Sequence, residues 1–246
     1  MANHNAAQGR FLDALVILES AWQLALATDY PPLRINTTIS RGNILFALDH
    51  RAEAFSAWES AAAEAEASAL PGLAARARLY AIRGHLLLLA DTDVAYAQAL
   101  RAQVLAEIAA FRRGEELSLA SGYLTLALAE KHLQRWAEAE AAARRALAIY
   151  ERGRFLEDSA YSWFIIASIR SLSGSYDSAL LALRTAIEID RRAENGFGLA
   201  SSWHAMGDVY RNAGRLQESR AAHQRAADIY RAIGHHDRAE ELERQY

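Results

Sequence analysis

The chain has 246 residues, a formal net charge of −3 at pH 7 and no cysteine, and 52% of its residues are hydrophobic. The near-neutral charge gives no electrostatic basis for binding nucleic acid or an anionic lipid surface. The lack of cysteine excludes disulfides and thiolate metal sites, and it is compatible with a reducing compartment.

The amino-terminal segment shows no targeting or membrane signal. Residues 1–8 lack a basic region followed by an apolar one, so we expect them not to be a signal peptide but to be disordered or tag-like. The longest apolar stretches are interrupted by charged residues such as Asp13, Glu19 and Arg83. They are therefore too short to span a membrane. These features predict a soluble cytoplasmic protein.

The segment 9–28 has the pattern of half a helical repeat. Its start, from Gly9 to Ala14, resembles the turn and second-helix start at Gly174 to Ala179. The matching first helix would need more residues upstream than the chain has. We favour a chain that is part of a longer polypeptide over an array that begins on a half repeat. In either case the open end would need a cover, from an upstream domain or from a second copy of the chain.

Further helix pairs follow in order along the chain. Pro31-Pro32 predicts the end of the first helix, because proline cannot continue a helix, and Ile35 is expected to begin the next. Pro71-Gly72 predicts an extra connection that lengthens the step to the following repeat to about 45 residues. Asp91-Thr92-Asp93 is expected to form a turn and helix cap. The predicted helix pairs span 35–69, 73–112, 115–153, 157–194 and 197–233, and a capping helix spans 235–246.

The clearest helical hairpin lies between Ala200 and Tyr230. Trp203, Met206 and Tyr210 are three and four residues apart, which places them along one stripe of a helix. Gly207 lies in that stripe, where its missing side chain lets a second helix approach closely. Gly214 supplies the backbone freedom that the chain reversal needs.

This hairpin recurs along the chain at a constant step. Trp203 corresponds to Trp163 and Tyr123 in the two preceding units. An alanine recurs at one place in four successive second helices: Ala106, Ala146, Ala186 and Ala226. The period is about 40 residues, and a fixed period in this range is typical of a solenoid of stacked repeats.

These residues resemble the tetratricopeptide repeat family. The matching residues are Trp203, Met206, Gly207, Tyr210 and Ala226. Ser219 and His223 depart from the family pattern. The long period is similar to that of kinesin light chains and of sensor domains in large bacterial transcription activators and signalling ATPases. The resemblance implies an all-α fold, a right-handed superhelical solenoid of antiparallel helix pairs. We expect about five repeats plus terminal half repeats, in a single array over residues 1–246.

The sequence contains no group of residues typical of an active site. Gly196-Phe197-Gly198 lacks the strand and third glycine of a phosphate-binding loop, so it is interpreted as a turn. His235 and His236 are neighbours without a third ligand at a suitable spacing, and are interpreted as an exposed turn. We therefore expect no enzymatic activity, no cofactor and no metal.

The resemblance also implies a concave groove, lined by five positions of each first helix. On this chain these positions are Asn36, Ile39, Asn43, Phe46 and Ala47; Ser121, Leu124, Leu128, Lys131 and His132; Tyr161, Phe164, Ser168, Ser171 and Leu172; and Ser201, His204, Asp208, Arg211 and Asn212. The candidate partner-binding residues among them are Asn36, Asn43, Lys131, His132, Tyr161, Phe164, His204, Asp208, Arg211 and Asn212. An apolar middle of Phe164, Leu124 and Leu128 between hydrogen-bonding groups suits a peptide or protein segment.

Two functions agree with this pattern. The first is a non-catalytic protein–protein interaction scaffold that binds a peptide or protein segment in the groove. The alternative is a ligand- or partner-sensing module of a larger bacterial regulator, either a transcription activator or a signalling ATPase. No nucleic acid or membrane is expected among the partners.

Overall fold

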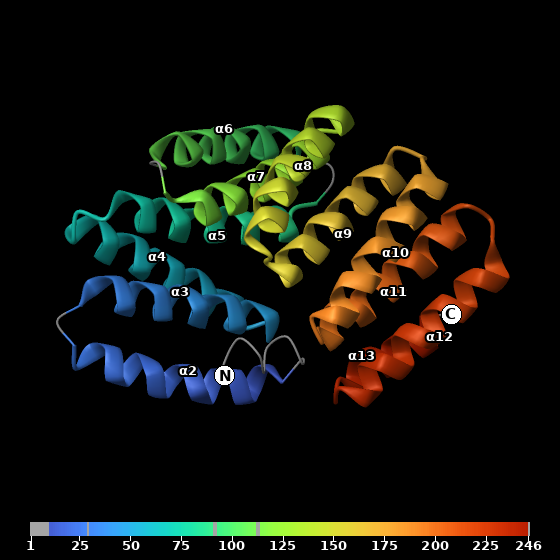
Figure 1. Cartoon of the computed structure of the whole chain (residues 1–246), viewed down its shortest axis with the longest axis horizontal. Helices are drawn as coiled ribbons and strands as arrows, with labels where there is room; N and C mark the ends of the chain where they lie inside the picture. The colour runs from blue at the N-terminus through green and yellow to red at the C-terminus, as the bar shows by residue number, and fades with distance from the viewer. Residues whose placement is uncertain (1–9, 29, 91–92, 112–113, 246) are drawn as a thin grey trace. The chain divides into compact units, whose positions relative to one another are not determined.

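The computed structural model describes residues 10–28, 30–90, 93–111 and 114–245. Within these ranges the chain forms twelve α-helices and no strand, as Figure 1 shows. The predicted all-α repeat fold is therefore confirmed. Residues 1–8, expected to be disordered or tag-like, lie outside the described residues, as do Asp91 and Thr92 of the predicted turn.

The helices follow one another with short connections. They are α2 (Phe11–Leu26), α3 (Pro31–Ala47), α4 (Arg51–Ala67), α5 (Pro71–Leu88), α6 (Val94–Ala110), α7 (Glu116–His132), α8 (Trp136–Gly153), α9 (Leu156–Leu172), α10 (Tyr176–Arg192), α11 (Gly196–Asn212), α12 (Leu216–Ala232) and α13 (His236–Gln245). From α7 onward, successive helices begin at residues 116, 136, 156, 176, 196, 216 and 236. Two helices therefore fill each period of the repeat.

Two helices begin earlier than the sequence pattern predicted. Pro31 begins α3, although Ile35 was the expected first residue, and Pro71 begins α5. Proline is favourable at the first helical position, because the N–H that it lacks would have no partner there and its φ is already set. The extra connection predicted at Pro71-Gly72 is thus wrong. The additional residues lie instead on either side of α6, which ends at Ala110 while α7 begins at residue 116.

The alanine column predicted for the second helices fails in α6. Ala146, Ala186 and Ala226 are fully buried, whereas Ala106 is exposed. The buried residues of α6 are Ala97, Leu100 and Val104, and Val104 takes the place that was predicted for Ala106. The reason is that α6 begins earlier, relative to α8, than the regular spacing of the later helices requires. The constant step therefore selects the wrong face of this helix.

The reversals in the later part of the chain share one backbone feature. A residue with positive φ follows each helix from α7 to α12, and it is glycine at Gly174 and Gly214, with φ of 80° and 75°. At the equivalent place, Gln134 and Glu194 adopt φ of 55° and 54° without being glycine. The left-handed conformation is therefore a property of the turn, and glycine only lowers its cost.

The chain consists of two compact units. The first unit comprises Phe11–Ala142 and the second Ala143–Tyr246, so the boundary falls within α8. Within each unit, successive helices pack against each other. The first helices also contact the first helix of the next repeat, α3 with α5, α5 with α7 and α9 with α11. Within each unit, these first helices therefore lie side by side. The handedness of the solenoid and the single array stay predictions.

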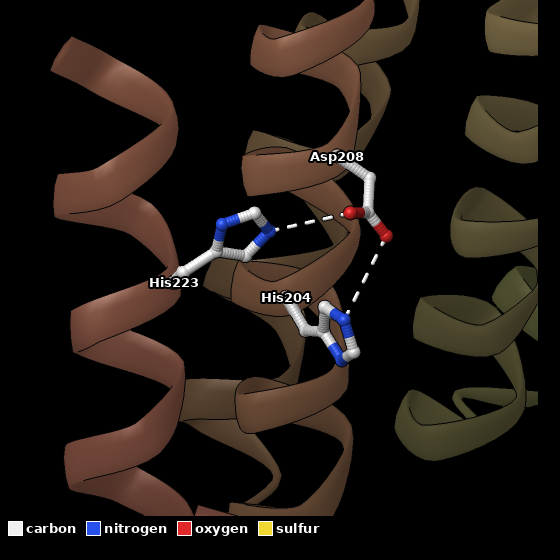
Figure 2. A group of neighbouring side chains, drawn as sticks. All are labelled: His204, Asp208 and His223. Carbon is white, nitrogen blue, oxygen red and sulfur yellow. Dashed lines mark hydrogen bonds and ion pairs between the residues drawn. The ribbon is translucent and has the colours of Figure 1, made fainter. Parts of the chain in front are cut away.

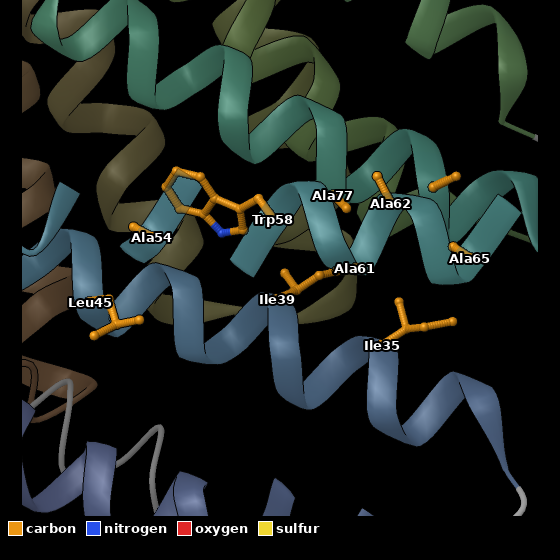
Figure 3. Packing of buried hydrophobic residues seen from close by; sticks show 10 residues of the cluster. Ile35, Ile39, Leu45, Ala54, Trp58, Ala61, Ala62, Ala65 and Ala77 are labelled. Carbon is orange, nitrogen blue, oxygen red and sulfur yellow. The ribbon is translucent and has the colours of Figure 1, made fainter. Parts of the chain in front are cut away.

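In the first unit, the core forms around one large ring opposite a glycine. Trp58 of α4 is 3% exposed and belongs to a buried cluster that also contains Ile35, Ile39 and small residues of α4 and α5, as Figure 3 shows. A Cβ on Gly42 of α3 would lie 2.5 Å from Nε1 of Trp58. The missing side chain of Gly42 therefore gives the indole ring its space.

The second unit uses the same principle with smaller residues. Its last repeat buries Ala200, Ala226, Tyr230 and Leu242 in one cluster. At Gly207, an added Cβ would lie 2.2 Å from Cδ2 of His223, which is 2% exposed. A buried histidine thus takes the place opposite this glycine.

Candidate functional site

A groove lies along the first helices of the second unit. Its volume is about 290 Å³. The residues that line it are Phe164, Ala167, Ser168, Ser171 and Leu172 of α9, Leu183 of α10, and Ala205, Asp208 and Val209 of α11. The lining is apolar, with two hydroxyl groups and one carboxylate among the apolar side chains.

The groove follows from helical spacing. Phe164, Ser168 and Ser171 are four and three residues apart, so they lie on one face of α9. Ala205 and Asp208 lie on the facing side of α11 with the same kind of spacing. Leu172, at the carboxyl end of α9, is 59% exposed, and it extends the apolar surface to the mouth of the groove.

An aromatic pair lies beside the groove on α9. The rings of Tyr161 and Phe164 are stacked, with centroids 6.1 Å apart and an angle of 12° between the planes. Phe164 of this pair also lines the groove. An apolar group bound in the groove would therefore meet a rigid aromatic surface.

Three polar side chains converge at the edge of α11. His204 and Asp208 are one turn apart on α11, and His223 comes from α12 (Figure 2). Nε2 of His223 lies 3.3 Å from Oδ1 of Asp208, and Nε2 of His204 lies 3.7 Å from Oδ2 of the same carboxylate. The two imidazole rings have centroids 5.6 Å apart. We call these three residues the histidine cluster.

The pKa values of both imidazoles in the histidine cluster are lowered from the ordinary value of histidine. Burial lowers the pKa of His223, and the nearby His204 lowers it further. Burial also lowers the pKa of His204, with Arg211 and Arg238 acting in the same direction. The negative charge of Asp208 opposes these effects at both rings without cancelling them.

Arg211 connects the histidine cluster to solvent. This exposed side chain donates from Nη2 to Oδ1 of Asp208 at 3.0 Å. Asn212, the next residue, is also exposed at the end of α11. Of the four partner-binding residues predicted on α11, Asp208 alone lines the groove, while His204, Arg211 and Asn212 lie outside its described lining.

The predicted residues of α3 are tied into the first unit. Asn36 accepts a hydrogen bond from Arg76 of α5 at 3.0 Å, and its amide donates to the carbonyl of Pro32. Asn43 accepts from Nε1 of Trp58 at 3.1 Å. Both side chains therefore have structural partners, and their role in binding a partner protein stays a prediction.

The predicted residues of α7 also lie in the first unit. Lys131 is half-buried, and Nε2 of His132 lies 2.8 Å from the carbonyl oxygen of Leu86. Leu124 and Leu128 were expected in the apolar middle of the groove, but each is 1% exposed. These two leucines are core residues because α7 turns this face toward its neighbouring helices.

A second pocket, of about 500 Å³, lies in the first unit between α2, α3 and α4. Its walls carry Arg34, Arg41, Glu53 and Glu64, and Arg34 pairs with Glu64 at 2.7 Å. The described lining contains none of the predicted partner-binding residues. The pocket is strongly charged, in contrast to the apolar groove of the second unit.

His223 is the residue that sequence analysis missed. It was noted only as a departure from the repeat pattern on the second helix. A signal was present, because His223 follows Gly207 at the same separation along the chain as Trp58 follows Gly42. This spacing places the side chain opposite the glycine of the first helix. His235 and His236, which were considered for a metal site and rejected, lie outside the histidine cluster.

A family model describes part of the chain. Residues 160–192, which cover most of α9 and all of α10 up to Arg192, match the model of the tetratricopeptide repeat. No curated protein matches the sequence. None of the helices in the described ranges is long and apolar enough to cross a membrane.

Solved structures share the fold at low sequence identity. A Rap protein complexed with competence and sporulation factor is 14% identical with a TM-score of 0.67, over 99% of this chain and 71% of that one. BtubC from P. vanneervenii is 17% identical with a TM-score of 0.59, over 92% of each chain. Aspartyl phosphate phosphatase F from Bacillus subtilis is 11% identical with a TM-score of 0.63, over 87% of this chain and 55% of that one.

At these identities the structural likeness concerns the fold alone. It agrees with the family model, because both describe repeated pairs of antiparallel helices. Residues 160–192 thus resemble one tetratricopeptide repeat, within a chain whose described residues form an all-α repeat fold.

Proposed function

We propose that the second unit is a non-catalytic binding module that holds a segment of a partner protein in the groove between α9 and α11. The observation that carries the proposal is the apolar surface of Phe164 and Leu172 beside the polar groups of Ser168, Ser171 and Asp208. Apolar side chains of a bound segment would gain from burial, and its backbone would find hydrogen-bonding groups at the same place.

The size of the groove favours a protein segment over a small metabolite. A volume of about 290 Å³ lies at the lower edge of the usual range for small-molecule sites, about 300–1,000 Å³. Such a space accepts one or two side chains of a longer segment that continues along the helices. The Rap protein of similar fold was solved in complex with competence and sporulation factor, which supports binding of another molecule as a use of this fold.

The alternative, a sensing module of a larger regulator, uses the same groove. It differs in the consequence of binding, because an occupant would then change a neighbouring domain. Binding in the groove is the step that both functions share. A test of the groove therefore comes first.

The test selects peptides from a random-peptide display library on the full-length protein and measures their affinity for two matched variants. Leu172→Arg places a charge in the groove, and Leu181→Arg places the same charge on α10 outside the described groove lining. The two leucines are 59% and 61% exposed, so neither substitution disturbs the core. We expect Leu172→Arg to weaken binding by about tenfold or more, equivalent to one lost apolar contact.

Leu181→Arg should leave the affinity of the same peptides unchanged. Equal affinity of the selected peptides for wild type and Leu172→Arg would contradict the proposal. An equal loss in both variants would also contradict it, because binding would then lie elsewhere or respond only to net charge. Circular dichroism of both variants verifies that the helices are intact.

A further inference from the structure

The histidine cluster has the composition of a metal site. It offers two imidazole nitrogens and one carboxylate from α11 and α12, and the ligand atoms all lie within 4.8 Å of one another. Imidazole together with carboxylate suits zinc and metals of similar preference, whereas calcium and magnesium prefer sites made of oxygen alone. We propose that His204, Asp208 and His223 bind a divalent transition-metal ion, with zinc as the preferred metal.

The distances fit this assignment. In a tetrahedral zinc site with bonds of about 2.1 Å, two ligand atoms lie about 3.4 Å apart. Nε2 of His223 lies 3.3 Å from Oδ1 of Asp208, and Nε2 of His204 lies 3.7 Å from Oδ2. With one ligand atom from each residue, the three atoms lie within 4.8 Å of one another. His204 is 36% exposed, and therefore has room for the small rotation that closes the third edge of the site. Three protein ligands leave a fourth position for water or another donor.

The surroundings of His223 favour metal binding through Nε2. Its other ring nitrogen, Nδ1, lies 3.5 Å from the hydroxyl oxygen of Ser219. When Nδ1 carries the proton and donates a hydrogen bond to the hydroxyl of Ser219, Nε2 keeps a lone pair on the side of Asp208, where it can bind a metal ion. Such a hydrogen-bond partner on the second nitrogen is typical of histidines that bind metals.

Packing alone does not account for the three residue types. The preceding repeat has Phe164, Ser168 and Leu183 at the equivalent positions, and it forms the same pair of helices. Gly207 also makes room for the imidazole of His223, because any side chain there would overlap the ring. The cluster therefore has a glycine that seats the ring and three side chains that its own fold does not require.

One competing interaction gives the proposal a distinctive consequence. Arg211 donates to Oδ1 of Asp208 at 3.0 Å, so a metal ion must share or replace this contact. Removing Arg211 should therefore strengthen metal binding. A cluster that served only to hold α11 against α12 would not show this effect.

The experiment measures zinc binding to the full chain, purified without a histidine tag, by isothermal titration calorimetry. Cobalt serves as a second probe, because four-coordinate cobalt has a strong visible absorption. We expect one ion per chain. His204→Gln and Asp208→Asn, at partly exposed positions, should each weaken binding at least about tenfold, and Arg211→Ala should tighten it by up to about fivefold.

His236→Gln is the matched control, because this exposed histidine lies outside the histidine cluster. It should leave the affinity for zinc unchanged. No saturable binding to wild type, or unchanged binding by His204→Gln and Asp208→Asn, would overturn the proposal. Leu172→Arg should keep full zinc affinity, so failure of the groove and failure of the metal site are distinguishable.

Discussion

Two hairpins of the molecule, α3–α4 in the first unit and α11–α12 in the second, share one local arrangement. Gly42 is followed directly by Asn43, and Trp58 stands opposite on the second helix. Gly207, Asp208 and His223 have the same separations along the chain. In both hairpins, the glycine admits a ring, and the polar residue after it lies within hydrogen-bond distance of a nitrogen of that ring.

The chemistry of the two arrangements differs. In α3–α4 the ring is an indole whose N–H donates to Asn43, and Phe46, Phe55 and Tyr80 surround it. In α11–α12 the indole is replaced by an imidazole and the carboxamide by a carboxylate. At the position of the buried Ile39, α11 carries a second imidazole, His204. One backbone arrangement thus serves packing in one hairpin and concentrates metal-binding groups in the other.

The largest expected difference between the hairpins is the cost of removing the ring. Trp58→Ala should destabilise the first unit by about 3–5 kcal/mol, because a large buried aromatic side chain leaves a cavity. His223→Ala should cost the second unit only about 1–3 kcal/mol, since the ring is smaller and its partner Asp208 keeps Arg211. Urea unfolding, with hydrogen exchange to assign each transition to its unit, measures both values. Equal costs would contradict the larger packing contribution expected for Trp58.

Substitution of Gly207 is expected to have an effect of intermediate size on stability. Gly207→Ala should cost about 1–3 kcal/mol, because the new Cβ overlaps the buried ring of His223. Adding His223→Leu should recover most of this loss, since Ala167 and Leu183 already form such a pair in α9–α10. The coupling between the two substitutions is read from a double-mutant cycle by urea unfolding. If the stability losses of the two single variants simply add in the double variant, Gly207 does not act through His223.

The smallest expected effect is a pH dependence confined to the second hairpin. The pKa values of His204 and His223 are lowered in the folded protein, mainly by burial. Below the ordinary pKa of histidine, about 6.5, the unfolded chain binds protons that the folded chain does not. Stability should therefore fall as the pH falls through this value and on to the folded pKa. A His204→Phe/His223→Leu variant should lack this loss.

Asp190 of α10 changes the pH dependence of stability in the opposite direction, so its contribution must be removed from the measurement. Burial raises its pKa to about 7, Glu157 adds to the rise, and hydrogen bonds from Asn195 and Ser202 oppose it. The folded protein therefore keeps a proton that the unfolded chain loses at lower pH, so this contribution to stability is lost as the pH rises toward 7. Both proteins should carry Asp190→Asn when the histidine effect is measured by urea unfolding across pH. If the stability of both proteins falls equally with falling pH, the two histidines are not the source of the loss.

Much of the fold was predictable because it repeats. Helical stripes such as Trp203, Met206 and Tyr210, together with a constant period, predicted the helices from α7 to α13 to within a residue or two. Two errors arose at prolines, because proline can end a helix or occupy its first position. Pro31 and Pro71 were interpreted as interruptions, yet each begins a helix. The period also fails at α6, where longer connections shift the buried face to Val104.

The candidate site was only partly predictable. The positions of Phe164 and Asp208 on the groove face were implied by the resemblance to tetratricopeptide repeats, and both residues line the groove. Leu124 and Leu128 were wrongly placed in it, because a helical position does not reveal how closely a neighbouring helix covers it. His223 was missed because its contact with Asp208 joins two helices. The space at Gly207 was expected from the sequence, but only the packed structure shows that the ring of His223 occupies it.

The most direct test of the difference between the hairpins is an anomalous-difference electron density map at the zinc absorption edge, from crystals of the full chain grown with zinc. We predict a peak bonded to Nε2 of His204, the carboxylate of Asp208 and Nε2 of His223, and no peak at Ile39, Asn43 and Trp58. The metal-site proposal would be contradicted if the map had no anomalous peak at the histidine cluster and the three side chains contacted only each other and Arg211.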